Sequence, residues 1–270
     1  MASAALTLGP PGFTQAWWFG ANGAIHNWHR HNELELSLVG AGSARYLVRD
    51  QSWHLNPGDL VFLFPEHDHV LVDTSPDFGM WIAVIDVNLL RPAARDPAFS
   101  TLLQGDPAED TVRRATRSDA RTIDGLFREA AQATNAAQTA LTTALFITAW
   151  NAYQRAASGT AVLVHPAVER AAAAISADPS ADCEAIARQA GLSQSRLSRL
   201  FHQQLGETMV QFRTRARLLY FQDLRERNPN ATLLALALQA GFGSYAQFHR
   251  AVHRIVGCKP ANWHQGRFAE

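Results

Sequence analysis

Residues 186–192, IARQAGL, recur at residues 236–242 as LALQAGF, and this pair of segments decides how the second half of the chain folds. In each copy, alanine lets a neighbouring helix pack closely, and Gly191 or Gly241 supplies a left-handed turn that other residues adopt only at a cost. After one extra residue in the second copy, the two sequences continue in step. The matching pairs are Leu197 with Phe248, Leu200 with Ala251, Phe201 with Val252, and Gly206 with Gly257. The chain therefore contains a duplicated unit of helix, glycine turn and helix.

The second helix of each unit is predicted to have one apolar and one polar face. Ser193 and Ser244 stand where an N-cap is expected. In the first copy, Leu197, Leu200 and Phe201 form the face that would be buried. The opposite face carries polar and basic side chains, namely Ser195, Arg196, Ser198, Arg199 and His202. This pattern is typical of a helix-turn-helix, whose second helix enters the major groove of DNA.

The distribution of charge supports the same interpretation. The whole chain has 24 basic and 24 acidic residues and no net charge. Residues 1–160 hold 11 arginines against 16 acidic residues, whereas residues 161–270 hold 13 basic against 8 acidic residues. Between residues 188 and 267 the balance is 12 basic to 3 acidic residues. A basic module of this kind is the electrostatic footprint of a nucleic-acid-binding domain.

The composition indicates a folded protein that stays in the cytoplasm. Of 270 residues, 47% are hydrophobic and 18% are charged, which excludes a mainly disordered chain. No stretch approaches the ~18 apolar residues of a membrane helix, and the N-terminus lacks the pattern of a secretory signal, so we expect no membrane partner. The two cysteines, Cys183 and Cys258, cannot form a disulfide framework.

The pattern along the chain predicts an α+β protein of two domains. Residues 12–90 read as short alternating strands separated by turns, which indicates a small barrel or sandwich. Two helices are expected at 118–134 and 137–157, followed by a linker that begins at 156–160. From Pro166 onward the chain reads as helical, so we predict domains at 1–160 and 161–270. The expected helices of the second domain are 166–177, 182–190, 193–204, 208–227, 232–240, 244–256 and 260–266.

The helical half resembles the DNA-binding domain of AraC/XylS-type transcription regulators over residues 166–266. The segment ALALQAGFGSYAQFHRAVHRIVGCKPANW is similar to the family's most specific pattern, in which Val252 and Met209 are departures that affect packing. The residues that match this pattern are Leu236, Ala237, Gly241, Phe242, Phe248, Arg250, Gly257, Pro260 and Trp263.

The resemblance implies two helix-turn-helix units, joined by a long helix at about 208–227, that enter successive major grooves of double-stranded DNA. The expected DNA-binding residues are Ser195, Arg196, Ser198, Arg199, Tyr245, Gln247 and Arg250. On the long helix, arginines are expected to contact phosphates or to form salt bridges rather than to read bases. They are Arg213, Arg215, Arg217, Arg225 and Arg227.

The N-terminal half resembles a cupin β-barrel over about residues 12–90. The spacing Gly23-x5-His29-x-His31-x3-Glu35-x6-Gly42 fits the first cupin motif, and Pro57-Gly58-Asp59 with Pro65-x3-His69 fits part of the second. Side chains alternate along a strand, so His29, His31 and Glu35 share one face. Together with His69 they are expected to converge inside the barrel, whereas His26, His54 and His67 lie off the motif and should not.

Three interpretations of this cluster remain open. His29, His31, Glu35 and His69 can hold a divalent metal, and such ligand types suit Fe, Mn, Ni or Zn. They can equally line a metal-free pocket for an effector, or they can be structural groups only. The barrel half is also rich in tryptophan, and Trp81 is the tryptophan predicted to bind the effector, because pockets combine apolar walls with a few polar groups.

The function predicted from these features is an effector-responsive, sequence-specific regulator of transcription rather than an enzyme. Its expected ligand is a small molecule, with a sugar among the candidates, and its expected partners are double-stranded DNA, RNA polymerase and a second copy of the chain that contacts the helices at 118–157. One alternative is a metal-dependent cupin enzyme with an appended helical domain. Another is a promoter-binding protein whose barrel only dimerises. A duplicated basic helix-turn-helix favours the regulator, because an enzyme has no need of it.

Overall fold

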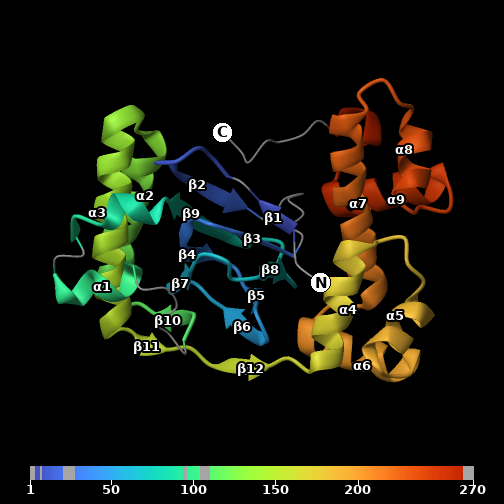
Figure 1. The fold of residues 1–270 in the computed structure, drawn as a ribbon, viewed down its shortest axis with the longest axis horizontal. Helices are drawn as coiled ribbons and strands as arrows, with labels where there is room; N and C mark the ends of the chain where they lie inside the picture. The colour runs from blue at the N-terminus through green and yellow to red at the C-terminus, as the bar shows by residue number, and fades with distance from the viewer. Residues whose placement is uncertain (1–3, 7, 21–27, 94–95, 104–109, 264–270) are drawn as a thin grey trace.

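The structure is a computed structural model that describes residues 4–6, 8–20, 28–93, 96–103 and 110–263. Strands fill the first half of the chain and form a barrel in the middle of the molecule, with helices on two opposite sides (Figure 1). The predicted α+β class is therefore confirmed. Among the described residues, no helix combines the length and the apolar character that crossing a membrane requires.

Within the described residues, the barrel consists of two six-stranded sheets that face each other. The first sheet runs in the order β1 (Ala4–Leu6), β3 (His29–His31), β8 (His69–Val72), β5 (Ala44–Val48), β6 (Gln51–Leu55) and β12 (Ala161–Leu163). The second sheet runs in the order β11 (Ala157–Ser158), β10 (Val112–Arg114), β7 (Asp59–Leu63), β4 (Leu34–Ala41), β9 (Gly79–Ile85) and β2 (Thr14–Gly20).

The helices agree with the predicted segments to within one or two residues. The first group is η1 (Val87–Leu90), α1 (Pro97–Leu103), α2 (Arg117–Gln132) and α3 (Asn135–Arg155). The second group is α4 (Pro166–Ala177), α5 (Cys183–Ala190), α6 (Gln194–Leu205), α7 (Met209–Arg227), α8 (Leu233–Gln239), α9 (Tyr245–Val256) and η3 (Pro260–Asn262).

Alternation along the strands gives each sheet an inner and an outer face, and both faces are buried. Between the sheets, Tyr46 and Leu71 of the first sheet meet Leu63, Met80 and Ile82 of the second. Their sequence neighbours point away from the barrel interior, because successive side chains of a strand lie on opposite faces. These outward side chains bind the two groups of helices.

Helices α2 and α3 cover the outer face of the second sheet. Leu36 and Leu38 of β4 pack there against Phe127 of α2 and Trp150 of α3. We expected the apolar faces of these helices to be wider than the barrel needs. Among the described residues, however, none of the exposed large hydrophobic side chains belongs to either helix, because the barrel and the helices cover one another's apolar faces.

The first helix-turn-helix packs on the outer face of the first sheet. Leu47 of β5 and Val70 of β8 share a hydrophobic core with Phe201 and Leu205 of α6. The molecule is thus layered as α2–α3, second sheet, first sheet and C-terminal helices (Figure 1).

The expected linker is built into the barrel. Residues 157–158 form β11 and residues 161–163 form β12, which pairs antiparallel with β6 in the register Ala161 with Trp53. Helix α4 begins at Pro166, three residues beyond β12. The boundary that we predicted between residues 160 and 161 therefore falls between two strands of the barrel.

Each duplicated unit has the local structure that the repeat predicts. Gly191 and Gly241 have φ angles of 79° and 89°, in the left-handed region that favours glycine. The Ser193 hydroxyl accepts the backbone N–H of Arg196 at 3.4 Å, and Ser244 caps α9 in the same way. Helix α7 joins the units, since its first half belongs to the core of the first unit and its second half to that of the second.

Candidate effector site and nucleic-acid interface

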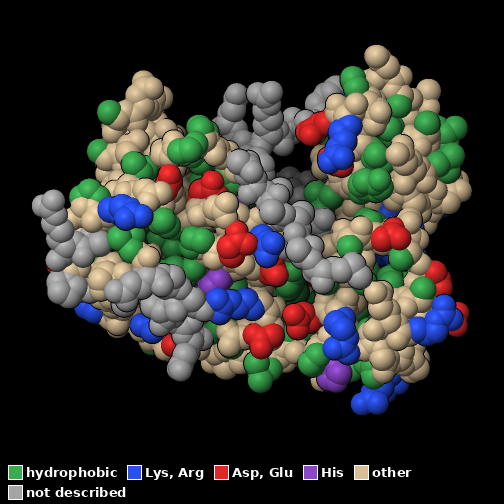
Figure 2. All heavy atoms as spheres, viewed as in Figure 1, with side chains coloured by type: hydrophobic (Ala, Val, Ile, Leu, Met, Phe, Trp, Pro, Cys, Tyr) green, Lys and Arg blue, Asp and Glu red, His purple; other side chains and the backbone are tan. Residues whose placement is uncertain are grey.

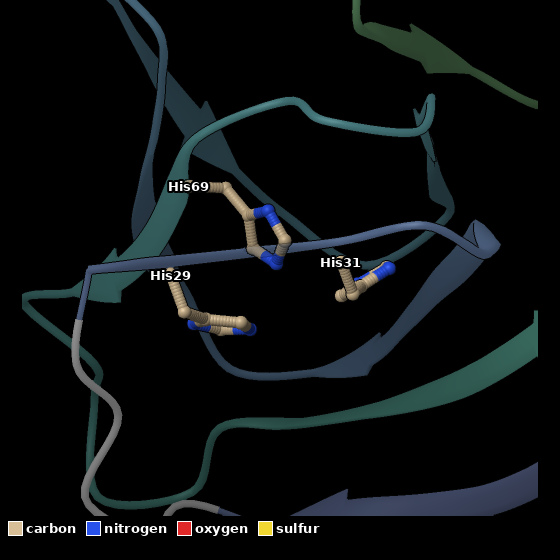
Figure 3. Close-up of side chains that lie close together, drawn as sticks. All are labelled: His29, His31 and His69. Atoms are coloured by element: carbon tan, nitrogen blue, oxygen red, sulfur yellow. The ribbon is translucent and has the colours of Figure 1, made fainter. Parts of the chain in front are cut away.

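Three histidines and one glutamate come together between the two sheets. His29 and His31 lie on β3, His69 begins β8, and the two strands pair where His29 faces His69. The three imidazoles point toward one another in Figure 3, and a ligand nitrogen of each lies within 4.8 Å of the others. Glu35 Oε2 lies 3.1 Å from His31 Nε2 and 3.9 Å from His69 Nε2. The structure thus brings together all four residues that strand parity and spacing predicted to converge.

Hydrogen bonds fix the orientation of these side chains. The Nδ1 atoms of His31 and His69 lie 3.1 Å and 2.8 Å from the backbone carbonyl oxygens of Glu33 and His67. Oε1 of Glu35 accepts hydrogen bonds from the hydroxyl of Ser37 at 3.2 Å and from that of Tyr46 at 3.3 Å. The second carboxylate oxygen, Oε2, is left facing the imidazoles.

The electrostatics of the cluster keep Glu35 ionised. Burial alone would raise its pKa, but the hydrogen bond from His31 and the charges of His69, His31 and His29 outweigh burial and lower the pKa to about 2. Burial and the neighbouring His29 lower the pKa of His69 to about 3. Burial also opposes the charged form of His31, yet Glu35 and Glu33 together raise its pKa. At neutral pH the site therefore combines a carboxylate with a neutral imidazole at His69.

The cluster forms the polar end of a small cavity. The cavity has a volume of about 40 Å³. Its polar lining consists of the three histidines, Glu35 and Tyr46, and its apolar lining consists of Leu8, Trp17, Leu71, Met80 and Ile82. This volume holds an ion and a few waters, whereas pockets for drug-sized ligands measure ~300–1,000 Å³.

Two of the three control histidines lie away from the cluster. His54 is exposed on β6. His67 is buried, but its Nε2 lies 2.6 Å from Nη2 of Arg49 rather than near Glu35. His26 lies outside the described residues.

The prediction for Trp81 is wrong. Met80 and Ile82 point into the cavity, so Trp81, which lies between them on β9, points to the opposite face. There its Nε1 donates to Asp124 of α2 at 2.7 Å and its ring stacks on Phe127. Trp17 is the tryptophan that lines the cavity, and the sequence analysis did not distinguish it from the other tryptophans.

The predicted DNA-binding residues lie on α6 and α9. Arg196, Arg199 and Arg250 are exposed, and among the described residues their side chains make no hydrogen bond or ion pair. Figure 2 shows Lys and Arg side chains around α5 and α6 at the edge of the molecule. The three arginines are therefore available to an external partner.

The other predicted DNA-binding residues also have roles within the fold. Ser195 is exposed beside Ser193, and Ser198 is half-buried with its hydroxyl 3.8 Å from the sulfur of Met209. The ring of Tyr245 lies near that of Phe248. Gln247 is exposed, but its Oε1 accepts the backbone N–H of Gly243 at 2.8 Å, so its amide NH₂ remains for DNA.

Arginines on α7 hold the helical half together. Arg215 pairs with Glu207 at 2.6 Å and Arg227 with Asp223 at 2.9 Å, as the salt-bridge alternative predicts. The guanidinium groups of the other three donate to backbone carbonyls. These bonds are Arg213 to Ala181 at 2.9 Å, Arg217 to Pro179 at 2.8 Å and Arg225 to Trp263 at 2.7 Å.

A junction that the sequence analysis missed joins α6 to the barrel through Gln204. Arg45 Nη1 of β5 donates to the backbone carbonyl of Gln204 at 2.7 Å. The Gln204 side chain accepts the backbone N–H of His165 at 2.9 Å and donates to the carbonyl of Leu163 at 3.5 Å. One residue of the first helix-turn-helix thus contacts both the barrel and the segment that enters α4.

Two family models match the chain. An AraC-like ligand binding domain matches residues 19–148, and a helix-turn-helix domain matches residues 186–266. The comparison with curated proteins gives no match.

Solved structures with a similar arrangement include regulators and one enzyme. ToxT from Vibrio cholerae is 12% identical over 93% of this chain and 97% of its own, with a TM-score of 0.36. The AraC-like transcriptional activator CuxR is 14% identical over 84% of this chain and 78% of its own, with a TM-score of 0.34. The DMSP lyase DddQ from Ruegeria pomeroyi is 25% identical over 26% of this chain and 36% of its own, with a TM-score of 0.23.

At these TM-scores the structural likenesses carry no argument, and the assignment rests on the two family models. The models cover the barrel with its helices and the duplicated helical units, and they favour a regulator over an enzyme. The chain is therefore an AraC-type transcription regulator, in which a ligand-binding domain precedes a helix-turn-helix DNA-binding domain.

Proposed function

We propose that residues 1–160 sense a small ligand in the barrel cavity and that residues 161–270 bind double-stranded DNA according to the state of that cavity. The observation that carries this proposal is a wall shared by the two parts. Strands β5 and β8 line the cavity with one face and pack against the first helix-turn-helix with the other.

Alternate residues of the wall serve its two faces. Tyr46 and His69 line the cavity, whereas Leu47 and Val70, which directly follow them, belong to the core of the first helix-turn-helix. A ligand that shifts the inner side chains also shifts the outer ones, because both sets share the strand backbone. The ligand changes DNA binding only by favouring one arrangement of the wall over another.

The junction at Gln204 extends this coupling to the helix proposed to read DNA. Gln204 lies near the C-terminal end of α6, and its carbonyl is bonded by Arg45 from β5. Arg45 immediately precedes Tyr46, which holds the carboxylate of Glu35. A chain of direct contacts therefore links the cavity to the position of α6.

DNA binding is proposed to use exposed side chains of α6 and α9. Arg196, Arg199 and Arg250 contact base edges or flanking phosphates, because arginine suits both acceptors. The remaining contacts are assigned to Ser195, Ser198, Tyr245 and Gln247. The same function implies RNA polymerase as a partner at the promoter and a cytoplasmic location.

Salt dependence of DNA binding tests the proposed function. We expect the full chain to bind a duplex from its own upstream region, and its affinity to fall by about 10³–10⁵ between 50 and 200 mM salt, because about 6–10 phosphate contacts release counterions. Fluorescence anisotropy with labelled duplex measures the affinity, and a duplex of scrambled sequence is the control. Equal affinity for the two duplexes, or affinity that does not change with salt, would contradict the proposal.

A homodimer is proposed to form through α2 and α3. These helices lie on the side of the barrel away from the DNA-binding half, and Leu126, Leu141 and Ile147 are half-buried there. Sedimentation velocity at micromolar concentration is expected to show a dimer of the full chain. Replacing Leu141 and Ile147 with Asn should shift it to a monomer, and a wild-type monomer in the presence of DNA would exclude this arrangement.

A further inference from the structure

We infer that His29, His31, His69 and Glu35 hold one divalent first-row transition-metal ion of the zinc class, so that the ligand of the barrel is a metal ion. This inference rests on the proposed function, because it names the ligand of the same cavity. It is carried by the donor atoms, their partners and the space between them.

The outer nitrogens of two histidines leave their inner nitrogens free to bind a metal. His31 Nδ1 and His69 Nδ1 lie within hydrogen-bond distance of the backbone carbonyls of Glu33 and His67. A carbonyl accepts only, so each Nδ1 carries the proton and each Nε2 can present a lone pair. A histidine fixed in this way by a backbone carbonyl is the usual arrangement around metal-bound imidazoles.

His69 is also a buried polar group without a partner. Its side chain is 1% exposed, and among the described residues its Nε2 makes no hydrogen bond. The atom is aimed into the cluster, where Glu35 Oε2 lies 3.9 Å away (Figure 3). Buried nitrogens of this kind rarely stay unsatisfied in native proteins, so an ion that accepts this lone pair explains its position.

Glu35 is held as a ligand with one free oxygen. Ser37 and Tyr46 both donate to Oε1, which leaves Oε2 facing His31 and His69. An ionised carboxylate only accepts hydrogen bonds, and so does an imidazole Nε2 lone pair. Lone pairs placed against one another in this way need a cation or a proton between them.

The dimensions of the cluster suit a small ion. Four ligands at about 2.0–2.2 Å from a tetrahedral zinc lie about 3.3 Å from one another. Here Oε2 of Glu35 lies 3.1 Å and 3.9 Å from the Nε2 atoms of His31 and His69, and the histidine nitrogens lie within 4.8 Å of one another. Small rotations of the side chains close this difference, and the cavity of about 40 Å³ is too small for a sugar.

The donor set also selects the metal. Imidazole nitrogens suit zinc, copper, iron and nickel, whereas magnesium and calcium prefer ligand sets made of oxygen. Binding of such an ion would tie β3 to β8 and β4. Strand β3 pairs with β8 at one position, His29 with His69, and it carries β1 on its other side. The metal would therefore fix an otherwise lightly paired strand to the wall shared with the first helix-turn-helix.

The inference is tested on the full chain after dialysis against a chelator. We expect isothermal titration with Zn²⁺ to show one site per chain, no comparable heat with Mg²⁺, and a rise in melting temperature with Zn²⁺. His69→Ala and Glu35→Gln should each lower the affinity for Zn²⁺ at least tenfold. His54→Ala removes an exposed histidine from a neighbouring strand and should leave Zn²⁺ binding unchanged, and circular dichroism confirms that each variant is folded.

The outcomes separate this inference from the proposed function. A wild-type chain that takes up no Zn²⁺ or Co²⁺, or one whose affinity is the same in His69→Ala and Glu35→Gln, overturns the metal site. Binding to the upstream duplex is measured on the same samples. Specific DNA binding without metal uptake overturns the metal site alone, whereas loss of sequence preference in the metal-loaded wild type overturns the proposed function.

Discussion

Leu47→Ala is expected to lower the free energy of unfolding by about 2–5 kcal/mol, as other large-to-small substitutions in well-packed cores do. Leu47 is 2% exposed and lies in the core between the barrel and the first helix-turn-helix. The substitution opens a cavity behind the wall that carries Tyr46 on its other face. Urea unfolding of the full chain measures the change. We also expect the DNA affinity of the variant to respond less to the barrel's ligand than that of the wild type.

Leu163→Ala provides the matched control for this substitution. Leu163 is 69% exposed on β12, so the same change should alter stability by no more than about 0.5 kcal/mol. Equal effects of the two substitutions would mean that the barrel and the first helix-turn-helix do not share a core in solution.

Arg199→Ala is expected to weaken DNA binding by about 1–3 kcal/mol, roughly 10- to 150-fold, if its guanidinium pairs with a guanine. Arg199 is exposed on α6, and among the described residues its side chain has no partner in the protein. The loss should concentrate at one base pair of the operator. Anisotropy titrations with a set of duplexes, each substituted at one position, measure this preference.

Arg227→Ala removes the same charge from a residue that already pairs with Asp223 on α7. It should weaken binding far less than Arg199→Ala and equally for every duplex. A uniform loss in Arg199→Ala as well would reassign that arginine to a phosphate contact.

Local patterns in the sequence predict most of the fold and the cluster in the barrel. The repeat around Gly191 and Gly241 indicates both helix-turn-helix units, because glycine and the following serine act within a few residues. Strand parity predicts that His31 and Glu35 share a face, because the leucines between the polar residues of β4 point the other way.

The face of Trp81 could not be predicted in the same way. All seven residues of β9 are buried, so the strand reads as one apolar run without the polar alternation that would identify its inner face. The contacts of Gln204 with β5 and β12 also leave no local signal, since they join residues more than 30 positions apart.

Helix α7 makes the separation of the two DNA-reading helices a property of the protein. It has 19 residues and therefore spans about 28 Å, and its halves are embedded in the cores of the two units. A DNA turn measures about 34–36 Å, so this rigid connection resembles a ruler with little room for adjustment. Inserting one base pair between the two subsites would rotate one of them by about 34° around the duplex. The operator of this regulator is therefore constrained in its internal spacing as well as in its bases.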